Sequence, residues 1–213
     1  MKYNNVIFDL DGVLVFTDEF HYAAWKVIAD KLCIAFDESV NNRLRGVSRL
    51  ESLDIILSYS EKRFTDAEKL AMATEKNEIY KNYLQDLSPK SVSLETIAML
   101  DKLQEMNVKL AIGSSSKNAE FILEKTKILH YFAAIASGNN ITKTKPDPEV
   151  FLLAAKLLGA EPKSCLVIED AHAGIEAAHA GGFDSVGMGD AYSSNLATYS
   201  VRGVDEICTI VCG

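Results

Sequence analysis

The chain has few cysteines, no long hydrophobic run and no excess of positive charge. Its four cysteines form neither a CxxC pair nor a zinc-type pattern with histidine, so we expect reduced thiols in a cytoplasmic protein. No apolar run approaches the ~20 residues that span a bilayer, and the N-terminal residues lack a signal-peptide pattern. A formal net charge of −8 argues against a general nucleic-acid or anionic-membrane surface. We take a monomer as the expected state.

The length and composition are those of a globular protein. With 213 residues, of which 48% are hydrophobic and 24% charged, the chain can form one or two domains with a substantial core. It contains no internal repeat and no low-complexity segment.

Short apolar segments with β-branched residues alternate with longer helical patterns. The expected strands are Val6–Phe8, Val108–Ile112, Ala133–Ala136, Cys165–Ile168 and Ser185–Met188. Continuous apolar strands alternating with helices predict an α/β fold, with a Rossmann-like parallel sheet covered by helices on both faces. Ligands of such sheets bind beyond the carboxyl ends of the strands, where several segments here run into acidic or small polar residues.

A helical insertion interrupts this alternation after the first strand. Its expected helices are His21–Leu32, Ser39–Arg45, Arg49–Ser60 and Thr65–Asp86. Two of them begin with the spacing of a capping box, Ser48 to Glu51 and Thr65 to Glu68. We therefore predict a core domain of residues 1–15 and 92–213, and an inserted all-helical cap domain of residues 16–91.

Further helices are expected after the insertion. They cover Ser93–Asn107, Asn118–Lys127, a helix with Asp147 as N-cap and Pro148 as first residue, and Ala171–Gly181. The last segment, Thr198–Gly213, has no readable pattern.

Two aspartates end the first predicted strand. Asp9 and Asp11 are two residues apart, so strand geometry points both carboxylates the same way, and Gly12 lets the chain turn after them. Two carboxylates this close repel each other unless a cation or a shared proton compensates. The alternative is a simple Asx turn at the end of a strand.

A second acidic pair, Glu169-Asp170, ends the fourth predicted strand. If the two strands are neighbours, several carboxylate oxygens meet at one point. Oxygen ligands without clustered histidine or cysteine favour Mg²⁺ over zinc. The pair could instead supply an acidic cap for the following helix.

Ser114 and Lys145 are candidates for binding a transferring phosphoryl group. Ser114 ends the second predicted strand, and Lys145 precedes Pro146. A hydroxyl and a lysine can bind the equatorial phosphoryl oxygens, and the lysine offsets the charge of the carboxylates. Taken singly, each would be interpreted as a helix cap or a solvated charge.

Together these residues resemble the four motifs of the haloacid dehalogenase superfamily. The segment Val6–Leu14 is similar to the first motif, and Ser114, Lys145 and Glu169-Asp170 fall where the second, third and fourth motifs are expected. The helical insertion is similar to the type 1 cap of that superfamily. The resemblance covers nearly the whole chain.

This resemblance implies a role for each motif residue. Asp9 would be the nucleophile that forms an aspartyl-phosphate, and Asp11 the general acid and base. Mg²⁺ would be held by the Asp9 carboxylate, the Asp11 backbone carbonyl and Asp170, with Glu169 assisting. Such a covalent, metal-assisted route suits phosphate monoesters, whose uncatalysed hydrolysis is extremely slow.

Within the superfamily, the sequence resembles the β-phosphoglucomutase subfamily in both domains. The residues that carry this resemblance are Thr17, His21, Trp25, Gly46, Val47, Ser48, Arg49, Ser52, Lys76, Asn77, Ser114, Ser115, Ser116, Lys117 and Asn118. It implies sugar phosphates as substrates, namely β-glucose 1-phosphate, glucose 6-phosphate and β-glucose 1,6-bisphosphate.

A mutase must bind a phosphate at each end of its substrate. Arg49 would hold the distal phosphate together with Ser116, Lys117 and Asn118 at the start of a helix. His21, near Asp11, and Lys76, near the sugar, would take part in cap closure, which excludes water. Without the resemblance, Arg49 and Lys76 would be interpreted as surface charges, and His21 and Trp25 as packing residues on one helix face.

The sequence departs from the β-phosphoglucomutase pattern at two places, and two alternative functions stay open. Phe16 and Ser93-Leu94 stand where the subfamily usually has an Asp and a Pro-Gly pair, and both fall in the expected linkers. A sugar-phosphate or phosphoglycolate-like phosphatase would use the same nucleophile with water as acceptor. A phosphoacceptor signalling module with Asp9 or Asp170 as acceptor would turn over no sugar, and the cap insertion argues against it.

Overall fold

The computed structural model describes residues 1–44 and 47–213, and within them the chain forms one six-stranded parallel sheet in the order β3-β2-β1-β4-β5-β6. The strands are β1 (Asn5–Phe8), β2 (Lys109–Gly113), β3 (Ala134–Ala136), β4 (Cys165–Glu169), β5 (Asp184–Gly187) and β6 (Tyr199–Ser200). The five predicted strands and the α/β fold class are confirmed. The two-residue β6 was not predicted, since too few residues pair there to leave an apolar pattern.

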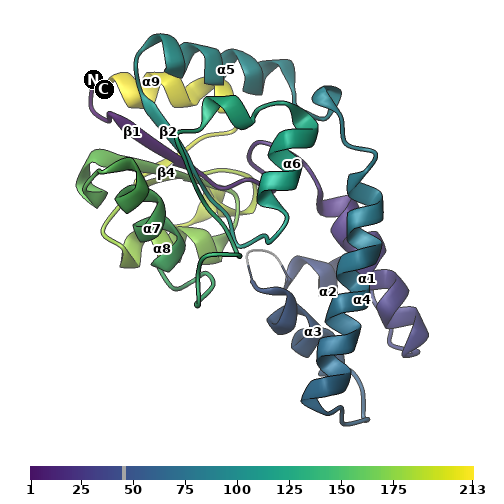
Figure 1. Cartoon of the computed structure of the whole chain (residues 1–213). Helices are drawn as coiled ribbons and strands as arrows, with labels where there is room; N and C mark the ends of the chain where they lie inside the picture. Colours follow the sequence, from purple (N-terminus) through teal and green to yellow (C-terminus); the bar gives the residue numbers. More distant parts are fainter. Residues whose placement is uncertain (45–46) are drawn as a thin grey trace.

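Helices cover both faces of the sheet because successive strand residues point to opposite sides. Val6 and Phe8 pack in one apolar cluster with α5 (Leu94–Glu105), α6 (Ala119–Thr126) and α9 (Ile207–Cys212). Ile7, between them, packs in a second cluster with α7 (Glu149–Leu158) and α8 (His172–Ala180). Figure 1 shows α5 and α9 on one side of the strands and α7 and α8 on the other.

Strand β1 lies in the middle of the sheet, and this position creates the site. Phe8 pairs with Ile112 of β2 and with Ile168 of β4. The residues that follow these three strands therefore come together at one edge. Asp9, just after β1, donates its backbone N–H to the Ile168 carbonyl at 2.9 Å.

The insertion between β1 and β2 is helical, as predicted. It contains α1 (Asp18–Lys31), α2 (Glu38–Asn42), α3 (Arg49–Leu57) and α4 (Asp66–Leu84), which extend to one side of the sheet (Figure 1). It has its own apolar cluster, which includes Trp25, Leu53 and Ile56. Tyr80 and Leu84 near the end of α4 pack instead in the first sheet cluster. The domain limits at 15/16 and 91/92 stay predictions.

Helix ends agree with the sequence in most places. Both capping boxes are confirmed, at Ser48 for α3 and at Thr65 for α4. The expected end of the second helix at Arg45 lies outside the described residues. Short 3-10 turns occupy Pro89–Ser91, Leu129–Tyr131, Pro162–Ser164, Gly189–Ser193 and Val204–Glu206.

Predicted helix starts differ from the structure at two places that line or flank the site. The first helix of the insertion was expected from His21, but α1 begins at Asp18, three residues earlier. The start of α7 was misplaced by one residue. Pro148, not Asp147, is the N-cap of α7, and the helix begins at Glu149. The Asp147 N–H is engaged by the Thr144 carbonyl at 3.0 Å, so this residue belongs to the preceding turn. Its carboxylate still accepts from the Glu149 N–H at 3.0 Å, as a capping side chain would.

No helix in the described part of the chain combines the length and the apolar character needed to cross a membrane.

Candidate active site

A cavity of about 680 Å³ lies between the carboxyl ends of the strands and the helical insertion. The predicted site residues that line it are Asp9, Asp11, His21, Trp25, Val47, Ser48, Arg49, Ser52, Lys76, Ser114, Ser115, Ser116, Lys117, Asn118, Lys145, Glu169 and Asp170. Thr17 does not line the cavity, but its hydroxyl donates to the Asp11 carboxylate. Gly46 lies outside the described residues.

A buried lysine joins two carboxylates at the floor of the site. Lys145 donates to Asp9 and, at 2.6 Å, to Oε1 of Glu169. Burial lowers the pKa of Lys145, but the two carboxylates outweigh it and raise this pKa above its usual value. Lys145 is therefore held as an ammonium beside the Asp9 carboxylate, where a phosphoryl group could be bound.

Burial also perturbs the carboxylates. It raises the pKa of Asp9 to about 7, an effect that Lys145 opposes and that Glu169 and Asp11 reinforce. It raises the pKa of Asp11 to about 6, while the Thr17 hydroxyl bond acts in the opposite direction. A carboxyl group that titrates near neutral pH suits proton transfer, because it can both give and accept a proton.

Asp170 lies directly against the turn after β1. A Cβ atom on Gly12, whose φ is +86°, would come 2.1 Å from Oδ2 of Asp170, so only glycine leaves room for this carboxylate. Burial raises the pKa of Asp170 to about 9, with Glu169 and Asp9 adding to the shift. These raised pKa values mean that the crowded carboxyl groups hold protons near neutral pH unless a cation takes their place.

This donor set fits Mg²⁺. Mg²⁺ is usually held by one or two carboxylates together with substrate phosphate and water, so Asp9, Asp170 and the Asp11 carbonyl suffice. Glu169 is otherwise engaged, since its oxygens accept from Lys145 and, at 2.8 Å, from the Ala171 N–H. The described residues contain no group of three or more His, Cys, Asp or Glu side chains that could hold a metal ion.

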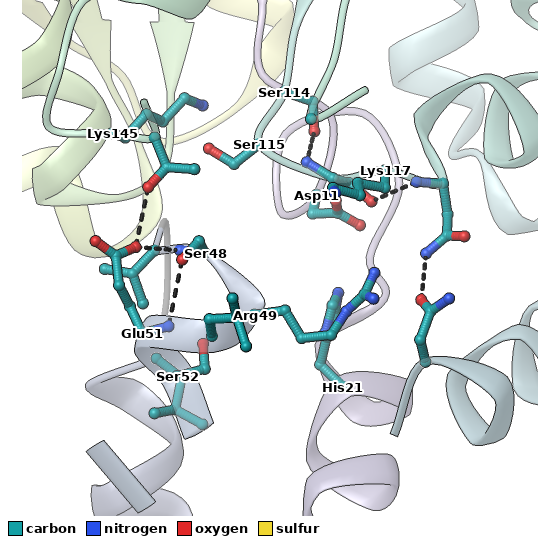
Figure 2. A pocket seen from close by; sticks show the side chains of 18 of the residues that line it. Asp11, His21, Ser48, Arg49, Glu51, Ser52, Ser114, Ser115, Lys117 and Lys145 are labelled. Carbon is teal, nitrogen blue, oxygen red and sulfur yellow. Dashed lines mark hydrogen bonds between the residues drawn. The ribbon is translucent and has the colours of Figure 1, made fainter. Parts of the chain in front are cut away.

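The loop after β2 presents hydroxyls and a lysine to the cavity. The Ser116 N–H donates to Ser114 Oγ at 3.1 Å, and the Asn118 N–H to Ser116 Oγ at 3.2 Å (Figure 2). These bonds leave both hydroxyl hydrogens available as donors. The Ser115 hydroxyl oxygen is buried and has no hydrogen-bond partner among the described residues. Asn118 is the N-cap of α6, so the positive end of that helix also points to this side.

The helical insertion contributes buried nitrogen groups. Lys76 of α4 is 2% exposed and lies 2.8 Å from Nδ1 of His21 on α1, with its ammonium over the rings of Trp25 and Tyr80 at 4.9 and 4.5 Å. Burial, reinforced by Arg49, lowers the pKa of Lys76 to about 7. Burial also holds the pKa of His21 well below its usual value, with Lys76 and Arg49 adding to the effect. The imidazole is therefore neutral.

Arg49 is the first residue of α3 and lines the cavity from the insertion side. Val47, Ser48 and Ser52 line it with Arg49, and the Ser52 side chain is buried. Figure 2 shows Lys145 and Lys117 on different sides of the cavity, with Arg49 extending from α3 toward His21. Cationic groups thus line the cavity from both the sheet edge and the insertion.

Some cavity residues were not singled out from the sequence. Tyr80 follows Lys76 by four residues on α4, so helical spacing could have found it. Glu51 was predicted only as a capping residue, yet it also accepts from the Thr144 hydroxyl at 2.9 Å. Thr144 precedes Lys145 in a loop, and no pattern marks a loop residue for such a contact.

A model of the haloacid dehalogenase-like hydrolase family matches residues 6–188. The chain belongs to this family. It is 40% identical over 204 residues to a β-phosphoglucomutase of Bacillus subtilis, covering 95% of this chain and 90% of the relative.

Other members of the haloacid dehalogenase family are also similar. A crystal structure of β-phosphoglucomutase from Clostridium difficile matches with a TM-score of 0.91 and 36% identity, covering 96% of this chain and 93% of that one. A fructose-1-phosphate phosphatase of Escherichia coli is 30% identical over 189 residues, covering 87% of this chain and 96% of the relative. The family match favours an enzyme over the signalling module.

Proposed function

We propose that this protein is a β-phosphoglucomutase, which interconverts β-D-glucose 1-phosphate and D-glucose 6-phosphate through β-D-glucose 1,6-bisphosphate. The observation that carries the proposal is a single cavity with cationic groups on two sides: Lys145 beside Asp9, and Arg49 with Lys117 elsewhere in the lining. A substrate with one phosphate needs one such set, whereas a bisphosphate needs two. The similarity to two β-phosphoglucomutases supports the same reading.

In the proposed reaction, the Asp9 carboxylate attacks the phosphorus atom of one phosphate of the bisphosphate. The bond from phosphorus to the sugar oxygen breaks, and Asp11 gives its proton to that oxygen. The sugar monophosphate that remains keeps its single phosphate in the distal site and leaves, and a monophosphate of the other isomer can bind there in its place. The bisphosphate binds in both orientations, so either of its phosphates can face Asp9. In the reverse step, a sugar hydroxyl attacks the aspartyl-phosphate while Asp11 takes the hydroxyl proton.

The other predicted residues have supporting roles. Ser114 and Lys145 would bind the transferring phosphoryl group, and Arg49, Ser116, Lys117 and Asn118 the distal phosphate. His21, Lys76 and Thr17 would link the insertion to Asp11. Trp25, Gly46, Val47, Ser48, Ser52 and Ser115 would line the sugar.

We further propose that Mg²⁺ is the cofactor, held by Asp9, Asp170 and the Asp11 carbonyl, with Glu169 assisting through Lys145. When bound, it would neutralise charge on the transferring phosphoryl group. Sugar phosphates are the proposed partners, in a cytoplasmic monomer. The four free cysteines are compatible with a reducing compartment.

A sugar-phosphate phosphatase is the second candidate, because the chain is 30% identical to a fructose-1-phosphate phosphatase. It would use the same Asp9 chemistry with water in place of the sugar hydroxyl.

A coupled assay separates the two candidates. The protein is given Mg²⁺, β-glucose 1-phosphate and a catalytic amount of glucose 1,6-bisphosphate, and glucose 6-phosphate and free phosphate are followed together. The mutase predicts glucose 6-phosphate with little free phosphate. Stoichiometric phosphate release would overturn the mutase proposal and favour the phosphatase.

A further inference from the structure

One hydrogen bond crosses the cavity between the insertion and the loop that carries Lys145. The Thr144 hydroxyl donates to Oε2 of Glu51 at 2.9 Å (Figure 2). Thr144 is the residue before Lys145, and Glu51 lies in the first turn of α3, two residues after Arg49. The bond therefore joins the chain segments that hold Lys145 and Arg49, which belong to the two phosphate sites of the proposed mutase.

The Glu51 end of this bond is fixed to the start of α3. The same carboxylate oxygen accepts from the Ser48 N–H at 2.8 Å, and the Glu51 N–H donates to Ser48 Oγ at 3.3 Å. These are the two halves of a capping box. Because Arg49 lies between Ser48 and Glu51, the position of the carboxylate is tied to that of the Arg49 backbone.

The Thr144 end is fixed to the start of α7. Glu149 accepts from the backbone N–H groups of Thr142 and Lys143 at 3.0 and 2.6 Å. The Thr144 carbonyl accepts from the Asp147 N–H at 3.0 Å. The backbone of the loop is therefore held on both sides of Thr144, next to Lys145.

We propose that Thr144 and Glu51 are positioning residues that set the spacing between Lys145 and Arg49, so that both ends of a sugar bisphosphate are engaged at once. This inference rests on the proposed two-phosphate site and adds a contact that helps to set the distance between its two ends. Neither side chain needs to contact the reacting atoms. Their loss should penalise a substrate that reaches both ends of the cavity more than one that occupies the Asp9 end alone.

The chain contains a matched control for the capping function of Glu51. Thr65 and Glu68 form the same capping box at the start of α4, with Thr65 N–H to Glu68 Oε2 at 2.8 Å. Glu68 does not line the cavity described by the structure. Glu51→Ala and Glu68→Ala therefore both remove a capping box, but only the first removes a bond to Thr144.

The test measures kcat/KM for two substrates in Thr144→Val, Thr144→Ser and Glu68→Ala. One is β-glucose 1-phosphate, with total consumption counted whether it is isomerised or hydrolysed. The other is p-nitrophenyl phosphate, which occupies the Asp9 end alone. In the proposed reaction β-glucose 1-phosphate reaches both ends, because its phosphate binds in the distal site while a sugar hydroxyl faces the phosphorylated Asp9. In Thr144→Val we expect the ratio of the two values to fall about three- to fivefold, the size expected for one partly exposed hydrogen bond. Thr144→Ser keeps the hydroxyl and Glu68→Ala keeps the bond, so both should retain the wild-type ratio.

A double-mutant cycle tests whether the two residues act through each other. In the Glu51→Ala background, adding Thr144→Val should change the ratio no further, because the bond is already gone. Three results would each overturn the inference. The first is an equal loss of kcat/KM for both substrates in Thr144→Val, and the second is additive effects on the ratio in the double variant. The third is the same change in the ratio in Glu68→Ala.

The wild-type product pattern keeps this test separate from that of the proposed function. If the wild type releases phosphate instead of glucose 6-phosphate, the mutase fails, and the two-phosphate span that this inference needs fails with it. A second outcome is that the wild type forms glucose 6-phosphate while Thr144→Val lowers kcat/KM equally for both substrates. In that case the mutase proposal stands and the positioning role fails. No consumption of the sugar phosphate by the wild type would overturn both.

Discussion

Lys145 Nζ lies 2.6 Å from Oε1 of Glu169, and both side chains are 1% exposed. The same ammonium also contacts Asp9, so one buried cation serves two carboxylates. A buried charge that loses its partner is costly, because the low-dielectric interior cannot replace it with water. The stability of the folded chain and the chemistry of Asp9 therefore depend on the same lysine.

Replacing Lys145 should affect both properties. We expect Lys145→Met to lower the free energy of unfolding by ~3–5 kcal/mol at pH 8. We also expect it to reduce the turnover rate at least ~1000-fold. Burial raises the pKa of Asp9 and Lys145 opposes this shift, so without the ammonium the Asp9 carboxyl should hold its proton more strongly in the folded state. The stability of the variant should therefore fall as pH rises from 5 to 8. Urea unfolding at both pH values, without added Mg²⁺, measures this. The exposed Lys163→Met is the control, and a pH-independent loss in Lys145→Met would contradict the ion-pair interpretation.

Because Gly12 contacts Asp170, the proposed metal site can be tested without replacing any of the proposed metal-binding residues. Gly12→Ala should displace the Asp170 carboxylate and raise the Mg²⁺ concentration for half-maximal activity about 10-fold or more. Gly182→Ala is the matched control, because Gly182 also has a positive φ, +76°, with no atom within 4 Å of an added Cβ. Both variants should lose ~1–2 kcal/mol of stability from backbone strain. An equal effect of the two on Mg²⁺ dependence would argue against Asp170 as a ligand.

Lys76 should destabilise the folded protein in exchange for function. The pKa of Lys76 is lowered to about 7 in the folded protein. Below that pH the side chain is charged in both states, so the full free-energy cost of burying the ammonium is present. Between pH 7 and the usual pKa of lysine, the unfolded state binds the extra proton, so the penalty shrinks as pH rises. We expect Lys76→Met to be more stable than wild type at pH 7 by a few kcal/mol, since each pKa unit is worth ~1.4 kcal/mol, while losing sugar-phosphate turnover.

Thermal unfolding of wild type and Lys76→Met at pH 7 and pH 9.5 measures that difference. The advantage of the variant should narrow at the higher pH. Lys81→Met, an exposed position on the same helix, should show no such change. If the stability difference between Lys76→Met and wild type is the same at both pH values, the pKa of Lys76 is not lowered in the folded state.

Arg49 tests the distal phosphate site. Arg49→Ala removes a guanidinium that could bind a phosphate through two hydrogen bonds, so we expect kcat/KM for β-glucose 1-phosphate to fall about 10- to 100-fold. Hydrolysis of p-nitrophenyl phosphate should fall much less. Arg43→Ala, an exposed arginine of the insertion that lies over Tyr59, serves as control. Equal losses for both substrates in Arg49→Ala would remove Arg49 from a distal site.

The sheet and the insertion could be predicted from the sequence because their signals are local. Continuous apolar strands such as Val6–Phe8 report burial on both faces, and a Ser or Thr three residues before a Glu reports a helix start. β6 was missed because two paired residues leave no periodicity. The start of α7 was misplaced because the Thr144 carbonyl draws Asp147 into a turn, a contact that the sequence does not encode visibly.

The cavity lining was anticipated mainly where a motif marks the residue. The carboxylates after β1 and β4 follow from strand ends that meet at one edge, and the structure brings them together with Lys145. The bond from Thr144 to Glu51 depends on how the insertion sits over the sheet, which no single segment determines. The same holds for Tyr80, whose ring lies 4.1 Å from that of His21.

The most direct test is to ask where the phosphoryl group goes. The protein is incubated with β-glucose 1,6-bisphosphate and Mg²⁺, and a phosphoryl adduct on the peptide that contains Asp9 is sought by mass spectrometry, with Asp9→Asn as control. The adduct is then chased with glucose 6-phosphate or with buffer alone. We predict an adduct in the wild type alone, discharged faster by the sugar phosphate than by water and yielding the bisphosphate. An adduct on another residue, or loss as free phosphate at the same rate with and without sugar, would contradict a mutase that works through Asp9.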